Sequence, residues 1–354
     1  MSPRERTTRA VRRQQPDRVP KTAGFTPYIQ QLFEQKTGQK DAASYFGMEM
    51  RNVGFRGPRE QGDFSRYYPE GIPEGASVTE YGTVHVPGDF YHFDRMRFPM
   101  RDLTTIEELE AYPWPDFTPE HRHAHLEADV QRLHGEGYFV VGGVGHIWET
   151  SWQLTGMEKL MMSFHDAPDF AAYVLDRVTE SRCFVARRCA EAGCEQILLG
   201  DDVGMQHRLM MHPNTWRQWL KPRLAREIKA ATDVNPEISV FYHSDGNIES
   251  IIEDLIEVGV TVLNPVQPEC MDPVALKRQY GDRLAFWGTI GTQTTMPFGT
   301  PDEVRAWVKH MCETVGQGGG LVLAPTHVLE PDVPWENIVA MFEAIDEYGV
   351  YDSR

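Results

Sequence analysis

Residues 238–267 read ISVFYHSDGNIESIIEDLIEVGVTVLNPVQ, and the pattern of this stretch indicates the fold class. The apolar runs 238–242 and 260–264 have no strict polar alternation, which is typical of strands buried on both faces. Residues 247–258 lie between these runs and predict a helix. A strand, a helix and a second strand in this order predict two parallel strands joined by a right-handed crossover.

The same alternation continues along the chain on both sides of this unit. We predict further buried strands at Tyr138–Val144, Gln196–Gly200, Leu284–Trp287 and Leu321–Ala324, and helices at Pro213–Ala231, Pro273–Tyr280, Pro301–Val315 and Pro334–Tyr348. Two weaker candidates, Arg18–Phe25 and Met50–Phe55, bring the strands to eight. We therefore expect an α/β protein with one domain over residues 1–354, a (β/α)8 TIM barrel with a long insertion after the second strand, at about residues 56–132. An open doubly wound sheet is the alternative, but no glycine-rich phosphate fingerprint follows the first strand.

The composition excludes several classes of protein. The chain has 354 residues, with 35 Lys and Arg against 52 Asp and Glu, and its formal charge of −17 argues against a nucleic acid as partner. No apolar run reaches the roughly 18 residues of a membrane-spanning helix, and the basic N-terminus lacks the apolar core of a secretory signal. The five cysteines are few and odd in number, which indicates reduced thiols and a cytoplasmic protein.

Polar residues follow each predicted strand, where a barrel of this class carries its chemistry. Three of them, His243, Asp245 and His327, form a set of two imidazoles and a carboxylate. This set resembles the ligands of a catalytic Zn²⁺ with an open fourth position. The alternative is structural: the imidazoles bond to backbone carbonyls and Asp245 caps the following helix. On residue types alone, the structural interpretation carries more weight.

Carboxylates near the same strand ends are candidates for proton transfer. Asp201 and Asp202 directly follow the strand 196–200, and Glu149 lies just past a glycine-rich stretch. Neighbouring carboxylates at a dry cavity repel each other, so one of them retains a proton near neutrality. The alternative is that they bond to turn amides or begin a helix.

Further side chains at the strand ends are expected to contact a small-molecule substrate. They are His146, His207, Gln267 and Gln293. The aromatic segment 85–98 of the insertion suits a lid over a flat substrate, a surface cluster of rings or a homodimer interface.

Several motifs together resemble the uroporphyrinogen decarboxylase (URO-D) superfamily. They are ILLGDDVG (197–204), FYHSDGNIESIIEDL (241–255), GDRLAFWGTIGTQ (281–293) and GGGLVLAPTH (318–327). The resemblance covers about residues 16–348, and the fold that it implies is the (β/α)8 barrel.

The resemblance implies two main activities. True decarboxylases of the superfamily bind the carboxylates of uroporphyrinogen through arginines of an N-terminal strand motif. The matching stretch here, RVPKTAGFTPYIQQ (18–31), has no arginine after its first residue, and Lys21 cannot replace an arginine fork. The other branch consists of corrinoid-dependent methyltransferases. Its thiol-using members hold zinc with a His-x-Cys pair and a later Cys, which His243, Asp245 and His327 match by position.

The resemblance therefore favours the methyltransferase branch. The change from thiolates to Asp245 and His327 shifts the metal preference toward oxygen and nitrogen ligands, and points away from coenzyme M toward ethers or other small methylated compounds. We predict metal-assisted methyl transfer, with zinc as the metal, between a small methylated substrate and a corrinoid supplied by a partner protein. A decarboxylase of uroporphyrinogen or a related carboxylate is the alternative. A non-catalytic module that binds a tetrapyrrole or another small molecule ranks last.

Overall fold

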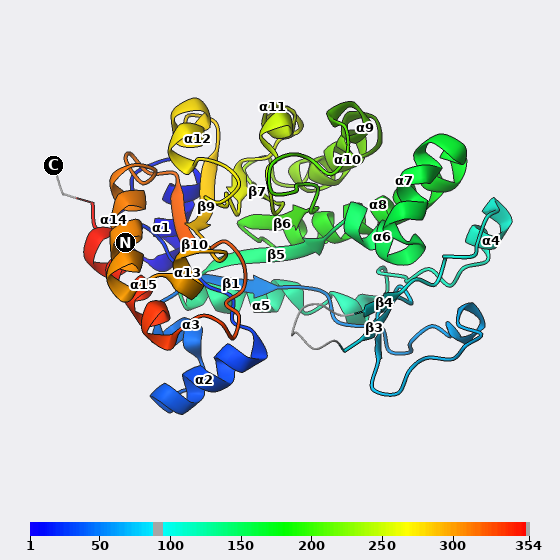
Figure 1. Ribbon diagram of the computed structural model, residues 1–354, viewed down its shortest axis with the longest axis horizontal. Helices are drawn as coiled ribbons and strands as arrows, with labels where there is room; N and C mark the ends of the chain where they lie inside the picture. The colour runs from blue at the N-terminus through cyan, green and yellow to red at the C-terminus, as the bar shows by residue number, and fades with distance from the viewer. Residues whose placement is uncertain (88–94, 352–354) are drawn as a thin grey trace.

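A parallel sheet that curls on itself forms the centre of the molecule (Figure 1). The computed structural model describes residues 1–87 and 95–351. Within these ranges, seven strands lie in the order β1-β5-β6-β7-β8-β9-β10, and every neighbouring pair is parallel. They are β1 (Met50–Val53), β5 (Phe139–Gly145), β6 (Gln196–Gly200), β7 (Ser239–His243), β8 (Val262–Asn264), β9 (Ala285–Ile290) and β10 (Leu321–Pro325). The six stronger strand predictions and the second weak one are confirmed, with small shifts at the ends.

The eighth position of the barrel is filled by the segment around Lys21. This segment forms isolated parallel bridges to β10 and the chain beyond it, Lys21 with Leu323 and Phe25 with Leu329. On its other side, the N–H of Glu49 donates to the carbonyl of Lys21 at 3.4 Å, next to β1. The predicted strand Arg18–Phe25 is therefore irregular, because Pro20 has no N–H to donate to a regular ladder.

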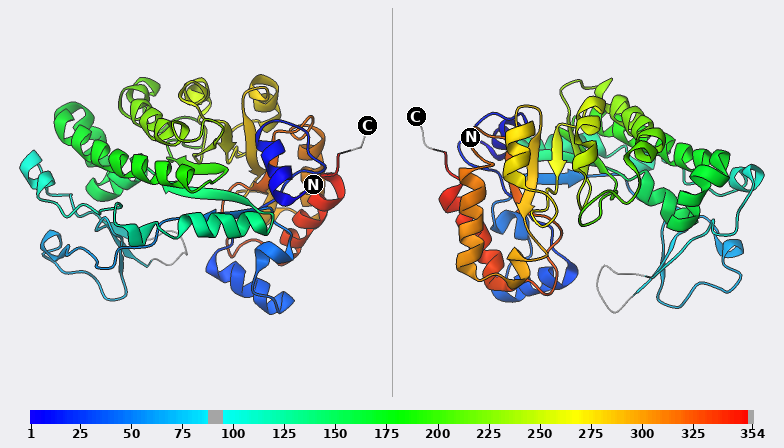
Figure 2. Two further views of the ribbon diagram at one scale, coloured as in Figure 1. Left: turned by 180° about the vertical axis from the view of Figure 1, so that it is seen from behind. Right: turned by 45° about the horizontal axis from the view of Figure 1, so that its top comes forward.

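Helices cover the outer face of the sheet, as Figures 1 and 2 show. After β5 they are α6 (Trp148–Thr155), α7 (Met157–Asp166), α8 (Pro168–Glu191), α9 (Pro213–Trp219), α10 (Lys221–Thr232), α11 (Ile252–Val258), α12 (Pro273–Tyr280), α13 (Thr295–Phe298), α14 (Pro301–Glu313) and α15 (Trp335–Tyr348). Strands and helices alternate through this half of the chain, so the predicted α/β barrel fold is confirmed. None of the helices described is both long enough and apolar enough to cross a membrane.

Two of the predicted helices differ from the structure. The helix expected over Pro213–Ala231 is broken at Leu220 into α9 and α10, because Pro222 removes one helical N–H and its ring clashes with the preceding turn. The helix expected from Asn247 starts later, with a 3-10 turn (η3, Glu249–Ile251) before α11. The N–H of Asn247 instead donates to the carbonyl of Met205 at 2.8 Å, which ties this loop to the loop after β6.

The chain between β1 and β5 is largely irregular and extends away from the barrel (Figure 2). It contains a small antiparallel sheet and short helices: β2 (Ser77–Val78), β3 (Val84–Val86), β4 (Arg95–Arg97), η1 (Ser65–Tyr67), α4 (Ile106–Glu110) and η2 (Glu120–Arg122). The helix α5 (Leu126–Gly135) already packs on β1 and β5 as a barrel helix, so the irregular part ends before the predicted boundary at residue 132. Half of the segment 85–98, the predicted lid, lies outside the described residues.

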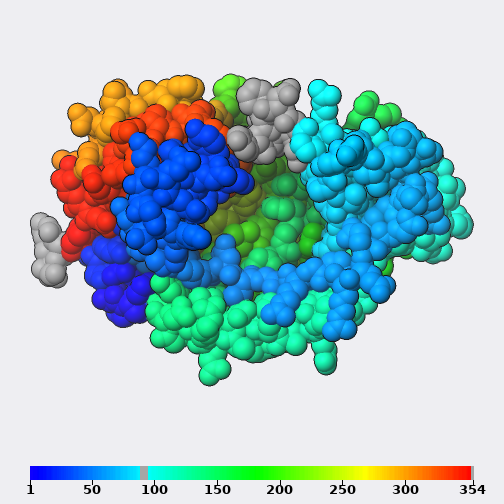
Figure 3. All heavy atoms as spheres, turned by 90° about the horizontal axis from the view of Figure 1, so that it is seen from below, coloured from blue at the N-terminus to red at the C-terminus, as the bar shows by residue number. Residues whose placement is uncertain are grey.

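The interior of the barrel is a small apolar core, separate from the larger core between sheet and helices. At its amino end it is closed by α1 (Pro3–Val11), whose residues Ala10 and Val11 are buried there. Helices α2 (Pro27–Thr37) and α3 (Ala42–Tyr45) connect the irregular first position to β1. Seen from below, the molecule is hollowed between the α2 region and the insertion, and the floor shows the green to olive colours of the chain around β6 and β7 (Figure 3).

Candidate active site at the carboxyl ends of the strands

A cavity of about 420 Å³ lies where the barrel strands end. Its apolar floor belongs to the interior core of the barrel and consists of Met50, Val141, Leu198, Phe241, Trp287 and Ala324. Above the floor, its polar lining consists of Thr22, Asn52, His146, His243, Asn264, Thr326 and His327. This size suits a small molecule, and the change from apolar floor to polar rim places reactive groups next to a dry surface.

Three potential ligand atoms gather around the end of β7. The Nε2 of His243 lies 3.5 Å from Oδ1 of Asp202 and 4.0 Å from Oδ1 of Asp245. The N–H of Asp245 donates to Oδ1 of Asp202 at 2.8 Å, which holds the two loops together. Atoms bound about 2.1 Å from a tetrahedral zinc ion stand about 3.4 Å apart, so this spacing fits a metal ion.

The close approach of β6 and β7 at this point depends on Gly200. Its φ is 151°, and a Cβ at this position would lie 2.2 Å from the carbonyl oxygen of His243. No side chain fits there. The glycine therefore brings the Asp202 loop within reach of His243.

The orientation of the His243 ring is set by Asn264, the last residue of β8. The Nδ2 of Asn264 donates to the carbonyl of Trp287 at 3.0 Å, so its Oδ1 faces His243 and accepts from Nδ1 at 2.6 Å. Because Nδ1 carries the proton, the lone pair of a neutral His243 is on Nε2, which faces Asp202 and Asp245. A histidine metal ligand needs such a partner on its other nitrogen.

One oxygen of Asp245 is an unexplained buried acceptor. Its Oδ1 is buried and has no hydrogen-bond partner in the described structure. Burial raises the pKa of Asp245, and the attraction of His243 and His327 does not cancel that effect. Burial lowers the pKa of His243, but the carboxylates of Asp202 and Asp245 raise it more, so its net shift is upward. A cation between these residues would satisfy the oxygen.

A second group, His146, Glu149 and Asp201, lies beside the first. The Nδ1 of His146 donates to the carbonyl of Gly200 at 2.7 Å and lies 3.5 Å from Oε1 of Glu149. The N–H of Glu149 donates to Oδ1 of Asp201 at 3.1 Å, and Oε1 of Glu149 accepts from the N–H of Asp202 at 2.9 Å. Burial and the charge of Glu149 raise the pKa of Asp201 well above its usual value, which favours a protonated carboxyl group.

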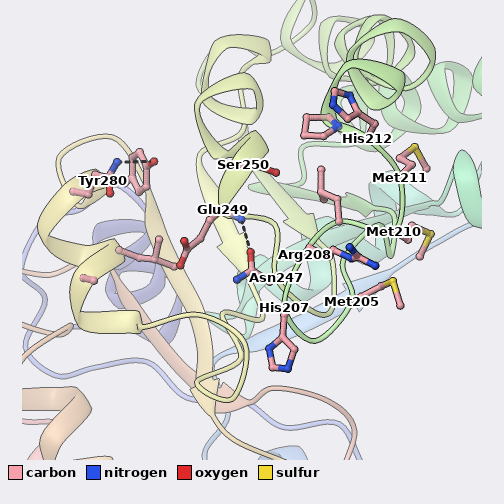
Figure 4. A pocket seen from close by; sticks show the side chains of 15 residues that line it. Met205, His207, Arg208, Met210, Met211, His212, Asn247, Glu249, Ser250 and Tyr280 are labelled. Atoms are coloured by element: carbon pink, nitrogen blue, oxygen red, sulfur yellow. Dashed lines mark hydrogen bonds between the residues drawn. The ribbon is translucent and has the colours of Figure 1, made fainter.

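The structure separates the remaining predicted residues. His327 lines the same cavity as His243, but it is not in the compact group of Asp202, His243 and Asp245, whose ligand atoms lie within 4.8 Å of one another. Gln267 is buried, and its Oε1 accepts from the N–H of Gly246 at 2.6 Å, so it supports the loop after β7. His207 lines a separate outer pocket among methionines (Figure 4).

Gln293 is exposed and does not line the cavity in the described structure; its N–H donates to Oε1 of Glu269 at 3.2 Å. Sequence reasoning assigned no role to Asn264, Asn52 or Trp287. Asn264 and Trp287 end their predicted strands, so attention to the last inward-facing residue of each run, as well as to the residues after it, would have found them.

Comparison with known proteins gives one family and two kinds of relative. The sequence model described as "Uroporphyrinogen decarboxylase (URO-D)" matches residues 97–348. A methylcobamide:CoM methyltransferase, MtaA, from Methanosarcina barkeri is 31% identical over 209 residues, which are 59% of this chain and 58% of that protein. A uroporphyrinogen decarboxylase from Methylococcus capsulatus is 23% identical over 272 residues, 72% of each chain. The chain thus spans little more than half the length of the methyltransferase relative.

Among solved structures, a methyltransferase from Methanosarcina mazei shares the fold. It superposes with a TM-score of 0.70 over 98% of this chain and 99% of the other, at 20% sequence identity. This similarity extends over the irregular first barrel position and the insertion.

Proposed function

The chain belongs to the uroporphyrinogen decarboxylase family, and we propose that it is a metal-assisted methyltransferase. It would move a methyl group between a small methylated substrate and a corrinoid presented by a partner protein. The methylcobamide:CoM methyltransferase, at 31% identity, is more similar than the uroporphyrinogen decarboxylase, at 23%. All five cysteines are free thiols, which fits our expectation that the reaction takes place in the cytoplasm.

The observation that carries the proposal is the buried, unpartnered Oδ1 of Asp245 beside Nε2 of His243. These two residues would hold the metal, and Asp202 and His327 are the candidates for its further protein ligands. The donor set of oxygen and nitrogen atoms suits zinc. When bound, the ion would supply Lewis-acid polarisation of a heteroatom in the substrate.

The residues of the chain itself would orient the substrate and move a proton. Asn264 keeps Nε2 of His243 directed at the two carboxylates. The apolar floor around Trp287 would exclude water from the methyl group. His146, which lines the cavity and contacts Glu149, would exchange the proton with the substrate, and the protonated Asp201 next to Glu149 would act as its reserve.

Metal analysis of the purified protein, after reconstitution with zinc and removal of excess ion, tests this proposal. We expect about one zinc per chain in the wild type and almost none in His243→Ala. His165→Ala, on the exposed face of α7, is the matched control and is expected to retain the metal. Zinc lost in Asp202→Ala or in His327→Ala identifies the further ligand. A wild type that binds no zinc, or equal zinc in His243→Ala and the wild type, would contradict the mechanism.

Decarboxylation of uroporphyrinogen is the second candidate, and it is favoured by the longer match to the decarboxylase relative, 72% of each chain. Incubation with uroporphyrinogen tests it directly. We expect no coproporphyrinogen, because none of the described side chains that line the cavity is an arginine or lysine able to hold eight carboxylates. Formation of coproporphyrinogen would replace the methyltransferase proposal.

A further inference from the structure

In the part of the chain that the structure describes, the cavity is lined by no side chain with a permanent positive charge. Among the described residues that line it, none is lysine or arginine, and the acids Glu149, Asp202 and Asp245 lie next to it. A carboxylate, sulfonate or phosphate group of a substrate would lose its hydration in the cavity and would find no lysine or arginine to pair with. It would also lie near these acids, which would repel it.

The two cations directly next in sequence to residues of the cavity lining, Lys21 and Arg51, are engaged elsewhere. Thr22, Ala23 and Gly24 line the cavity, but the Nζ of the preceding Lys21 pairs with Oδ1 of Asp346 at 2.5 Å. Lys21 is buried in this pairing, so it cannot turn toward a ligand without leaving Asp346.

Two arginines next to strands that line the cavity donate hydrogen bonds to backbone carbonyls. Arg51, between the lining residues Met50 and Asn52 of β1, donates to the carbonyls of Met48 and Met50 at 3.0 and 2.8 Å. Its guanidinium stacks on the ring of Tyr138, 3.8 Å from the centroid. Arg182 donates to the carbonyls of Val144 and His146, both at 3.2 Å.

The imidazoles of the rim do not supply the missing charge, because each has a carboxylate near it. His146 lies 3.5 Å from Glu149, and His243 lies 3.5 Å from Asp202. His327 acts electrostatically on Asp245. If both Asp202 and Asp245 are ligands, their two carboxylates balance the charge of a divalent ion, so the ion adds no net positive charge for an anionic substrate.

We infer that the site selects substrates without an anionic group, namely small neutral methylated compounds, whose methyl group would lie on the apolar floor of Trp287 and Phe241. This inference rests on the proposed function, which it narrows to a substrate class. The two rings pack edge to face with centroids 5.1 Å apart and offer an apolar surface of fixed shape.

Two thiols with the same two-carbon chain, one ending in a neutral hydroxyl and the other in an anionic sulfonate, test the inference. 2-Mercaptoethanol and 2-mercaptoethanesulfonate (coenzyme M) have the same thiol and two-carbon chain, and each is titrated calorimetrically into metal-free and zinc-loaded protein. We expect the neutral thiol to bind more tightly by at least about tenfold, and the difference to shrink as salt screens the carboxylates. Equal or tighter binding of the sulfonate, or no binding of either thiol, would overturn the inference.

A charge placed in the cavity provides the matched variant. Asn52→Arg introduces a cation on β1, and we expect it to strengthen binding of the sulfonate by at least about tenfold relative to mercaptoethanol. Asn52→Gln, which adds length without charge, is expected to keep the wild-type preference. An unchanged preference in folded Asn52→Arg, with folding checked by circular dichroism, would contradict the inference.

Methyl transfer from methylcobalamin is measured separately on the same protein. A preference for the neutral thiol without any methyl transfer would refute the proposed function and leave the charge selection intact. Methyl transfer together with a preference for the sulfonate would support the proposed function and refute the charge selection.

Discussion

The cavity at the strand ends and the outer pocket of Figure 4 differ in size and in the side chains that they bring together. The outer pocket is the larger, about 940 Å³ against about 420 Å³. Its lining combines methionines with polar groups that serve local structure: His212 accepts from the N–H of Asn214 at 3.2 Å and caps α9. In the smaller cavity, side chains from β6, β7 and β8 converge.

The difference follows from topology. Parallel strands deliver the residues at their carboxyl ends to one place, whereas a pocket between a loop and helices collects side chains from the surface of each. Asp202, His243 and Asn264 come from three neighbouring strand ends, and both Asp202 and Asn264 contact His243. The strand ends therefore bring the candidate ligands together, and variants of the two regions separate their roles.

We expect the largest effect, a loss of zinc affinity at the strand-end cavity, from Asn264→Leu. The substitution removes the acceptor that keeps the proton on Nδ1 of His243, so we expect zinc affinity to fall about 10- to 100-fold. Competition against a chromogenic chelator measures the affinity. Gln279→Ala, an exposed residue of the outer pocket, is the control and is expected to leave affinity unchanged. Equal affinities in Asn264→Leu and the wild type would show that the hydrogen bond does not orient a ligand.

We expect a smaller effect, on the pH dependence of stability, from the buried acid Glu227 of α10. When Glu227 is ionised, its charge raises the pKa of Asp201. The Oε1 of Glu227 is buried and has no hydrogen-bond partner among the described residues, and burial raises its pKa from 4.5 to about 8. The fold therefore favours the neutral carboxyl group. The wild type loses stability as pH rises from about 4.5 through about 8, because the unfolded chain releases this proton earlier.

Glu227→Gln removes this pH-dependent loss. We expect the variant to gain roughly 1 to 2 kcal/mol of unfolding free energy relative to the wild type at pH 8, and little at pH 4. Urea unfolding at the two pH values measures the gain. Glu249→Gln, in the exposed lining of the outer pocket, is expected to show no such trend. A gain in Glu227→Gln that is the same at both pH values would mean that the carboxyl group is not held neutral.

The repeating part of the barrel could be predicted from sequence, because runs such as 196–200 and 238–242 are buried on both faces and lack alternation. The irregular first position of the barrel was harder to predict. Pro20 interrupts the hydrogen-bond ladder of a regular strand, and isolated bridges to β10 take its place. The break between α9 and α10 was also missed, although Pro222 signals it in the sequence.

The proximity of the candidate residues could be predicted where they adjoin a strand, but not where a loop carries them away from it. His243 and Asp245 are two residues apart at the end of β7, so their proximity follows from local geometry. The position of His207 depends on the path of the loop after β6, and that of Gln293 on the loop after β9, which no periodicity specifies. Asn264 was overlooked because a terminal strand residue was counted as core.

Anomalous X-ray scattering from crystals grown with zinc would locate a metal ion bound by His243 and Asp245. We expect one strong anomalous peak in the cavity, within about 2.2 Å of Nε2 of His243 and of a carboxylate oxygen of Asp245. The same experiment identifies whether Asp202 or His327 completes the ligand set. A cavity without a peak, or zinc bound at the outer pocket instead, would contradict the claim.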